Sequence, residues 1–143
     1  MSRIGALADA LTDAINAKTW REPLTALRVD TPSVDLEDLD QLRAIVIPTT
    51  ETRERVARIA IQHDYRIQVG LQERLRQGDQ IARAEQLRSL ADDLADWLMV
   101  TQPGGSEAYP MSLDDSQPVQ QHLDDWSLYT HVLSVTYQEI TQL

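Results

Sequence analysis

The sequence predicts an α+β fold in which two amphipathic helices pack on a mostly antiparallel β-sheet. Apolar residues recur at helical spacing in two separate segments, and other segments alternate apolar with polar residues as strands do. The segments follow one another as helix, strands, helix and strands, without an internal repeat. The connections between strands are short, which favours antiparallel pairing. We therefore expect the 143 residues to form a single domain spanning residues 1–143.

The first helix is expected over residues 2–18. Ser2 is a suitable N-cap, because its hydroxyl can accept a hydrogen bond from a free backbone N–H of the first turn. Pro23 requires the helix to end before Trp20, since a residue that precedes proline avoids helical backbone angles. The apolar residues of this segment share one side of the helix: Ile4, Leu7, Ala8, Leu11 and Ile15.

Strands are expected in the next part of the chain. Residues 24–29 form a short strand that ends at the turn-forming residues 30–33, and residues 34–42 form a loop with one helical turn. The β-branched segment 43–47, which Pro48 bounds, has the strongest strand signal. Residues 52–62 and 65–75 are expected to form a β-hairpin with its turn at His63 and Asp64.

The second helix is expected to begin after Gly78, with Asp79 as N-cap, and to end before Pro103. Its apolar stripe comprises Ile81, Ala84, Leu87, Leu90, Ala91, Leu94 and Leu98. A short strand over 109–113, a polar loop over 114–125 and a last strand over 126–137 complete the predicted fold.

The composition excludes several classes of protein. The chain has no cysteine, which excludes a disulfide scaffold, a thiolate zinc site and a cysteine nucleophile. It has no run of about 18 apolar residues, so no membrane span is expected. Residues 1–10 also lack the basic-then-apolar order of a signal peptide.

Few residues point to catalysis or metal binding. No two of the histidines His63, His122 and His131 have the i,i+4 spacing of a metal-binding helix, and we expect His131 to be a packed or half-exposed strand histidine. The segment 122–125, near Asp114 and Asp115, has carboxylates and one imidazole that suit a hard cation, but a solvated acidic loop is the simpler interpretation. The sequence also lacks a phosphate-binding glycine loop and a G-x-S-x-G elbow. We therefore expect neither an enzyme nor a cofactor.

Charge is distributed unevenly along the chain. The net charge of −10 comes from 23 acidic and 13 basic residues. Residues 1–76 hold 12 acids and 11 bases, whereas residues 77–143 hold 11 acids and 2 bases, with no base after Arg88. Residues 43–76 are locally basic, with seven arginines against four acids. The overall charge argues against nucleic-acid binding through bulk electrostatics, although a local arginine patch leaves that possibility open.

The arginines concentrate on the predicted hairpin. They are Arg53, Arg55, Arg58, Arg66, Arg74 and Arg76. The planar guanidinium of arginine suits interfaces because it binds carboxylates with two hydrogen bonds. Three interpretations remain open: a surface that is solvated or paired within the subunit, a surface that docks on the acidic half of a neighbouring copy, and a contact with nucleic acid.

The acidic residues Asp92, Asp93 and Asp96 lie off the apolar stripe of the second helix. Asp92 and Asp96 share a face, where they repel each other unless a cation faces them. A solvated face is the simplest interpretation; a surface that faces a partner, and an acid/base pair or metal ligands, are the alternatives. The candidate subunit interface comprises Arg53, Arg55, Arg58, Arg66, Arg74, Asp92, Asp93 and Asp96. A contact between two different surfaces is heterologous, so its repetition closes a ring or extends a filament.

The order of elements resembles that of a known family. The resemblance covers most of the chain and rests on the N-terminal helix, the segment 20–29 with Thr31-Pro32, and further pieces over 36–39, 44–48, 65–69, 90–94 and 132–137. In these features the sequence is similar to the small tail terminator (minor tail, head–tail joining) proteins of long-tailed bacteriophages.

The resemblance implies an α+β fold, a hexameric ring and a structural role in the virion. Such rings cap the tail tube, end its polymerisation and join the tail to the head connector, after assembly in the host cytoplasm. DNA passes through the central channel without specific binding, which an acidic lumen would favour by repulsion. Two alternatives remain: another head–tail connector such as a stopper or neck ring, and a small acidic binding or inhibitor protein.

Overall fold

The computed structural model describes residues 2–30, 41–76, 78, 80–115 and 128–142. Two helices and five strands follow one another along the chain: α1 (Arg3–Ala17), β1 (Thr25–Arg28), β2 (Arg43–Ala57), β3 (Ala60–Arg74), α2 (Gln80–Val100), β4 (Tyr109–Asp115) and β5 (Leu128–Gln142). The predicted loop at 34–40, the Asp79 cap and the predicted loop at 116–125 lie outside the described residues.

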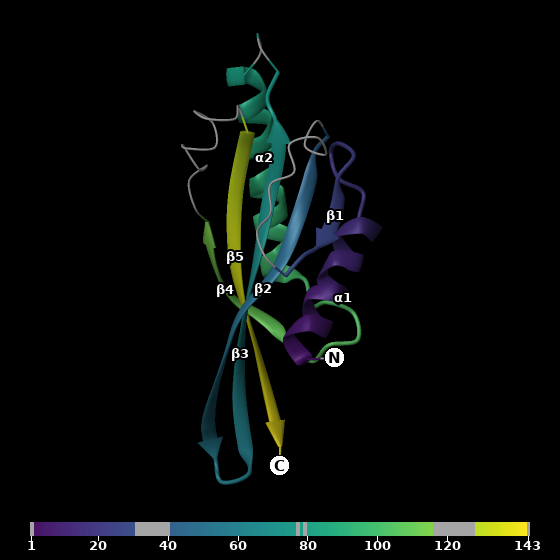
Figure 1. The fold of residues 1–143 in the computed structure, drawn as a ribbon. Coiled ribbons are helices and arrows are strands. Elements are labelled where there is room, and N and C mark those ends of the chain that lie inside the picture. Colours follow the sequence, from purple (N-terminus) through teal and green to yellow (C-terminus); the bar gives the residue numbers. More distant parts are fainter. Residues whose placement is uncertain (1, 31–40, 77, 79, 116–127, 143) are drawn as a thin grey trace.

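The strands form one sheet in the order β1-β2-β3-β5-β4. Only β1 and β2 pair in parallel, while the other three pairs are antiparallel. The sheet is long and twisted, and its central strands β2, β3 and β5 are the longest (Figure 1). The structure confirms the predicted α+β fold with its mostly antiparallel sheet.

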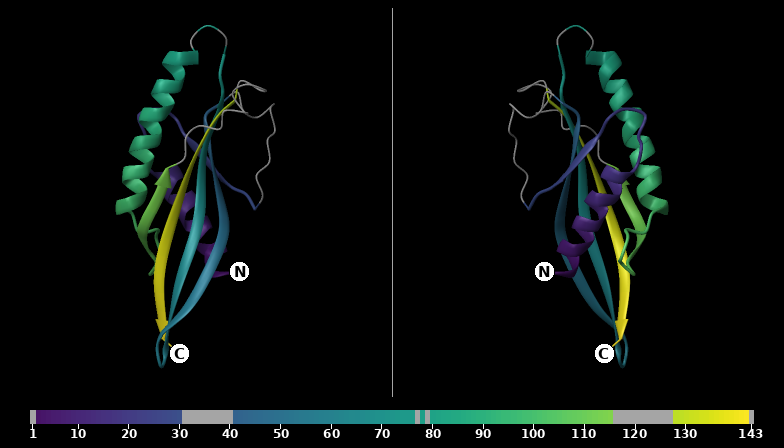
Figure 2. Two further views of the ribbon diagram at one scale, coloured as in Figure 1. Left: turned by 90° about the vertical axis from the view of Figure 1, so that its left-hand side faces the viewer. Right: turned by 90° about the vertical axis from the view of Figure 1, so that its right-hand side faces the viewer.

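Both helices pack on the same face of the sheet (Figure 2). Helix α1 lies over β1 and β2, and α2 lies over β4 and β5. Their apolar sides and the inward residues of the strands form one hydrophobic core, which confirms the predicted stripe of α1 and, from Ala84 onward, that of α2. The prediction was wrong for Ile81, which is 91% exposed because it lies in the first turn of α2, beyond the contact with the sheet. The fully buried members with the largest side chains are Tyr65, Tyr129, Tyr137, Leu11, Ile15, Ile67, Leu71, Leu87, Leu90, Leu94 and Leu98.

Polar contacts fix α1 on the edge of the sheet. Ser2 is the N-cap, as predicted, and its Oγ accepts a hydrogen bond from the backbone N–H of Gly5 at 3.1 Å. Asn16 binds both backbone groups of Ala26, accepting from its N–H at 2.8 Å and donating to its carbonyl at 3.1 Å. This double contact ties the helix to β1, so the short edge strand is held by α1 as well as by β2.

The hairpin prediction was wrong in the position of the turn. The turn lies at Arg58 and Ile59, between the paired residues Ala57 and Ala60, and His63 lies inside β3. Neither position offers the glycine or asparagine that marks a tight turn, so the sequence does not fix where the chain reverses. The alternation that was predicted only for residues 65–75 in fact continues back through His63.

Three further strand boundaries differ from the prediction. Strand β2 continues through Pro48 to Ala57, because β1 pairs only with residues 43–46 and Pro48 therefore lies on an edge, where its missing N–H costs nothing. Asp114 and Asp115 belong to β4 rather than to a loop. Strand β5 extends past Tyr137 to Gln142, because residues 138–142 pair with residues 60–64 of β3.

Candidate interaction surface

One end of the sheet projects beyond the helices as an arm. We call residues 51–64, the turn between β2 and β3 included, together with residues 138–142 of β5, the β-arm (Figures 1 and 2). Every side chain from Thr52 to Ile59 is exposed. Neither helix covers the tip of the arm, so the tip is available to another molecule.

Three of the predicted interface arginines, Arg53, Arg55 and Arg58, follow one another along the β-arm toward its tip. Arg53 and Arg55 share one face, because they pair across the hairpin with His63 and Ile61. Arg53 forms an ion pair with Glu51 at 3.0 Å. Arg55 Nη2 donates a hydrogen bond to the carbonyl of Arg58 in the turn at 2.5 Å. These contacts orient the guanidinium groups and leave them in contact with solvent.

The other two predicted interface arginines lie elsewhere, so the five do not form one patch. Arg66 is on the opposite face of the sheet, where its Nη2 lies 3.5 Å from Asp114 Oδ2. Arg74 ends β3, about 46 Å along the strand from Ala60 at the usual rise per residue. The prediction grouped Arg66 and Arg74 with the other arginines because all of them belong to one hairpin. The strands of this hairpin are long, so residues at their two ends lie far apart in space.

Exposed apolar side chains accompany the arginines on the β-arm. Val56 is 46% exposed, Ile59 is 56% exposed and Ile140 is 49% exposed. Single exposed apolar residues are common on protein surfaces, but these three belong to one projecting element. Residues 52–59, at the outer part of the β-arm, therefore combine three arginines and one acid with apolar area, a mixture that suits a protein–protein contact.

The predicted acidic residues divide into two groups on α2. Asp92 and Asp96 are exposed on the side of the helix that faces away from the core. Asp93 instead forms an ion pair with Arg21 of the same subunit, at 2.5 Å. Met99 and Val100 continue the outward side of α2, and Val100 is 83% exposed. We call Asp92, Asp96, Met99 and Val100 the outer face of α2.

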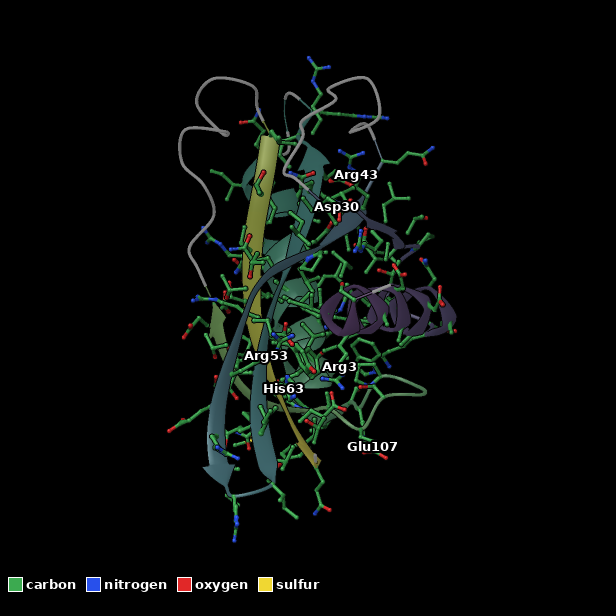
Figure 3. All side chains as sticks on the ribbon, turned by 60° about the horizontal axis from the view of Figure 1, so that its bottom comes forward. Arg3, Asp30, Arg43, Arg53, His63 and Glu107 are labelled. Carbon is green, nitrogen blue, oxygen red and sulfur yellow. The ribbon has the colours of Figure 1, made fainter. Side chains whose placement is uncertain are left out.

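A buried polar cluster fixes the root of the β-arm, and sequence reasoning missed it because His63 was placed in a turn. His63 Nε2 lies 2.8 Å from Thr141 Oγ1, and Nδ1 lies 3.3 Å from Glu51 Oε1. Arg3 Nη1 approaches the same ring at 3.4 Å from the start of α1 (Figure 3). The cluster joins β2, β3, β5 and α1, so the arm is anchored to the body.

Two other polar networks stabilise the body. Arg83 of α2 binds Glu73 of β3 at 2.6 Å and Glu22 at 2.5 Å, and these hydrogen bonds raise the pKa of Arg83. His131 is buried in β5, as a packed strand histidine, with Nδ1 2.8 Å from the Tyr129 hydroxyl and Nε2 against Asp115. Within the described ranges, no group of three or more His, Asp or Glu side chains gathers as a metal site requires. The predicted cluster 122–125 lies outside those ranges.

Raising the pH above 10 is expected to unfold the protein through its buried tyrosines. Burial raises the pKa of Tyr129 to about 12, and it also raises the pKa of Tyr137 and of Tyr65, whose hydroxyl donates to Glu139 at 2.9 Å. An unfolded tyrosine ionises near pH 10, so between the two pKa values the unfolded chain releases protons that the folded chain keeps. The contribution of each tyrosine to the free energy of unfolding is fully present below pH 10 and is lost as the pH rises from there through the pKa of the folded state.

The absorbance of tyrosinate, followed together with circular dichroism, measures this effect. Three of the four tyrosines should ionise in the same transition in which the structure is lost. Ionisation of these three in a chain that keeps its circular dichroism would contradict the expectation.

Comparison with known proteins supports the fold and leaves the function open. No protein-family model matches the chain, and no curated protein matches it. One solved structure is similar over 100% of this chain and 98% of its own, with 24% sequence identity and a TM-score of 0.52. Its given name is a sequence label that states no function. Within the described residues, no helix has both the length and the apolar composition needed to cross a membrane.

Proposed function

We propose that this protein is a tail terminator of a long-tailed bacteriophage, a structural protein without catalytic activity. Its copies form a hexameric ring that caps the tail tube, ends tube polymerisation and joins the tail to the head connector. The β-arm is the observation that carries the proposal, because it projects beyond the core with arginines and exposed apolar side chains at its tip. Such an element contributes little to an isolated subunit but suits contact with another one.

The sequence and the fold give further support. An α+β domain that begins with an amphipathic helix and ends with a long strand has the architecture that the resemblance to tail terminators implies. The net charge of −10 per subunit would make a ring strongly acidic. Repulsion would then keep DNA from adhering to the channel as it passes through, without specific binding.

Negative-stain electron microscopy of the protein, alone and mixed with polymerising tail tube protein, tests the proposal. The tube protein is to be taken from the gene neighbouring that of this chain. We expect rings, and tubes that carry a ring at one end and no longer grow from that end. Monomers beside tubes that continue to grow would contradict the proposal.

Two other outcomes identify the alternatives. Rings that bind a head connector but leave tube growth unchanged would overturn the terminator role in favour of a stopper or neck ring. A monomer that binds a basic enzyme, and loses it as salt is raised, would overturn ring formation in favour of an acidic inhibitor.

A further inference from the structure

We propose that the β-arm of one copy lies along the outer face of α2 of the next copy. This inference rests on the proposed function, and it names the surface that each subunit offers to its neighbour. The occupant of the outer face of α2 is thus a second copy of this chain. Charge, spacing and the order of apolar residues on the two elements support the pairing.

The arginines on one face of the β-arm and the aspartates on the outer face of α2 have opposite charges and similar spacing. Arg53 and Arg55 share a strand face two residues apart, which is about 6.8 Å. Asp92 and Asp96 are exposed one helical turn apart, which is about 6 Å along α2. Two guanidinium groups can therefore face two carboxylates at once, and each pair can form charge-assisted hydrogen bonds.

The apolar residues follow the charges in the same order on both elements. On the β-arm, Val56 and Ile59 lie beyond Arg55 toward the tip. On α2, Met99 and Val100 lie beyond Asp96 toward the end of the helix. When the charged pairs are aligned, the exposed apolar residues of the two elements meet and are removed from water, which stabilises the contact.

The contact must form between copies. In one subunit the tip of the β-arm extends away from α2, beyond the end of the helix (Figures 1 and 2). Helix α2 and the β2 strand of the β-arm both run toward the same end of the molecule. A neighbouring copy that keeps the same orientation and is displaced along the long axis therefore brings its α2 beside the β-arm. The contact joins two different surfaces, so its repetition closes a ring when each copy is also rotated about a common axis.

Engineered disulfides test the pairing, because the natural chain has no cysteine and gives no background. In I59C mixed with V100C, oxidation should produce a covalent dimer. In the double variant I59C/V100C, oxidation should produce covalent oligomers of increasing size, up to a covalently closed ring. The control mixture pairs I59C with L27C, whose cysteine replaces an exposed residue on β1 (44%), and should give at least tenfold less dimer.

The outcomes separate this inference from the proposed function. Electron microscopy could show rings while I59C cross-links equally well to V100C and to L27C. That result would overturn the inference without contradicting the proposed ring. Covalent oligomers of increasing size without a closed ring would support the pairing of the two surfaces and contradict ring closure. The absence of both rings and cross-links would overturn the inference and the proposed function together.

Discussion

An R55E/R58E variant is expected to remain a folded monomer under conditions in which the wild-type chain forms rings. Both residues are exposed near the tip of the β-arm and contribute no side chain to the core. Reversal of Arg55 places a carboxylate against the aspartates of the neighbour, and reversal of Arg58 adds a second negative charge beside it in the turn. Like charges brought together at an interface cost several kcal/mol, so we expect each contact to weaken by about 2–4 kcal/mol, or roughly 30- to 700-fold in its dissociation constant.

Sedimentation velocity measures whether the variant is monomeric, and circular dichroism measures whether it is folded. The matched control is R74E/R76E, which makes the same change in net charge at the opposite end of β3 and should still form rings. Adding D96R to R55E/R58E restores opposite charges at this position and leaves Arg53 opposite Asp92, so it should restore assembly. Assembly of R55E/R58E at the wild-type concentration would refute the role of the β-arm.

Leu94→Ala is expected to lower the free energy of unfolding by about 3 kcal/mol. Leu94 is fully buried in the part of α2 that packs on the sheet, so truncation removes apolar contacts and leaves a cavity. For a domain of this size the melting temperature should fall by about 6–12 °C. Thermal unfolding followed by circular dichroism is the measurement.

Met99→Ala is the matched control for this prediction. Met99 belongs to the same helix but is 38% exposed on its outward side, so its truncation should change stability by less than about 0.5 kcal/mol. Equal losses for the two variants would contradict the placement of α2 in the structure.

The fold class and the core could be predicted from the sequence because periodicity determines which side of each element is buried. The stripe of α1 and the alternation of β3 from Tyr65 to Leu71 each indicate the buried side without knowledge of the neighbouring element. The Ser2 cap is equally local, since it depends on one side chain and the turn that follows.

The β-arm could not be predicted, because its length depends on pairing between distant segments. Residues 138–142 extend β5 only because β3 is present beside them, and the turn at Arg58 and Ile59 has no glycine to mark it. The predicted interface included residues that the structure separates from the β-arm and from the outer face of α2, for the same reason. Arg74 shares a strand with the arm but lies at its far end, and Asp93 is taken by Arg21, a partner 72 residues away in sequence.

Native mass spectrometry of the wild-type chain tests the central claim, that the subunits close into a ring through unlike surfaces. We predict one dominant closed assembly, with a mass of about 97 kDa for six copies of the 16.2 kDa chain, that R55E/R58E dissociates to the monomer. A wild-type protein that remains monomeric at every concentration, and also in the presence of tail tube protein, would contradict the account.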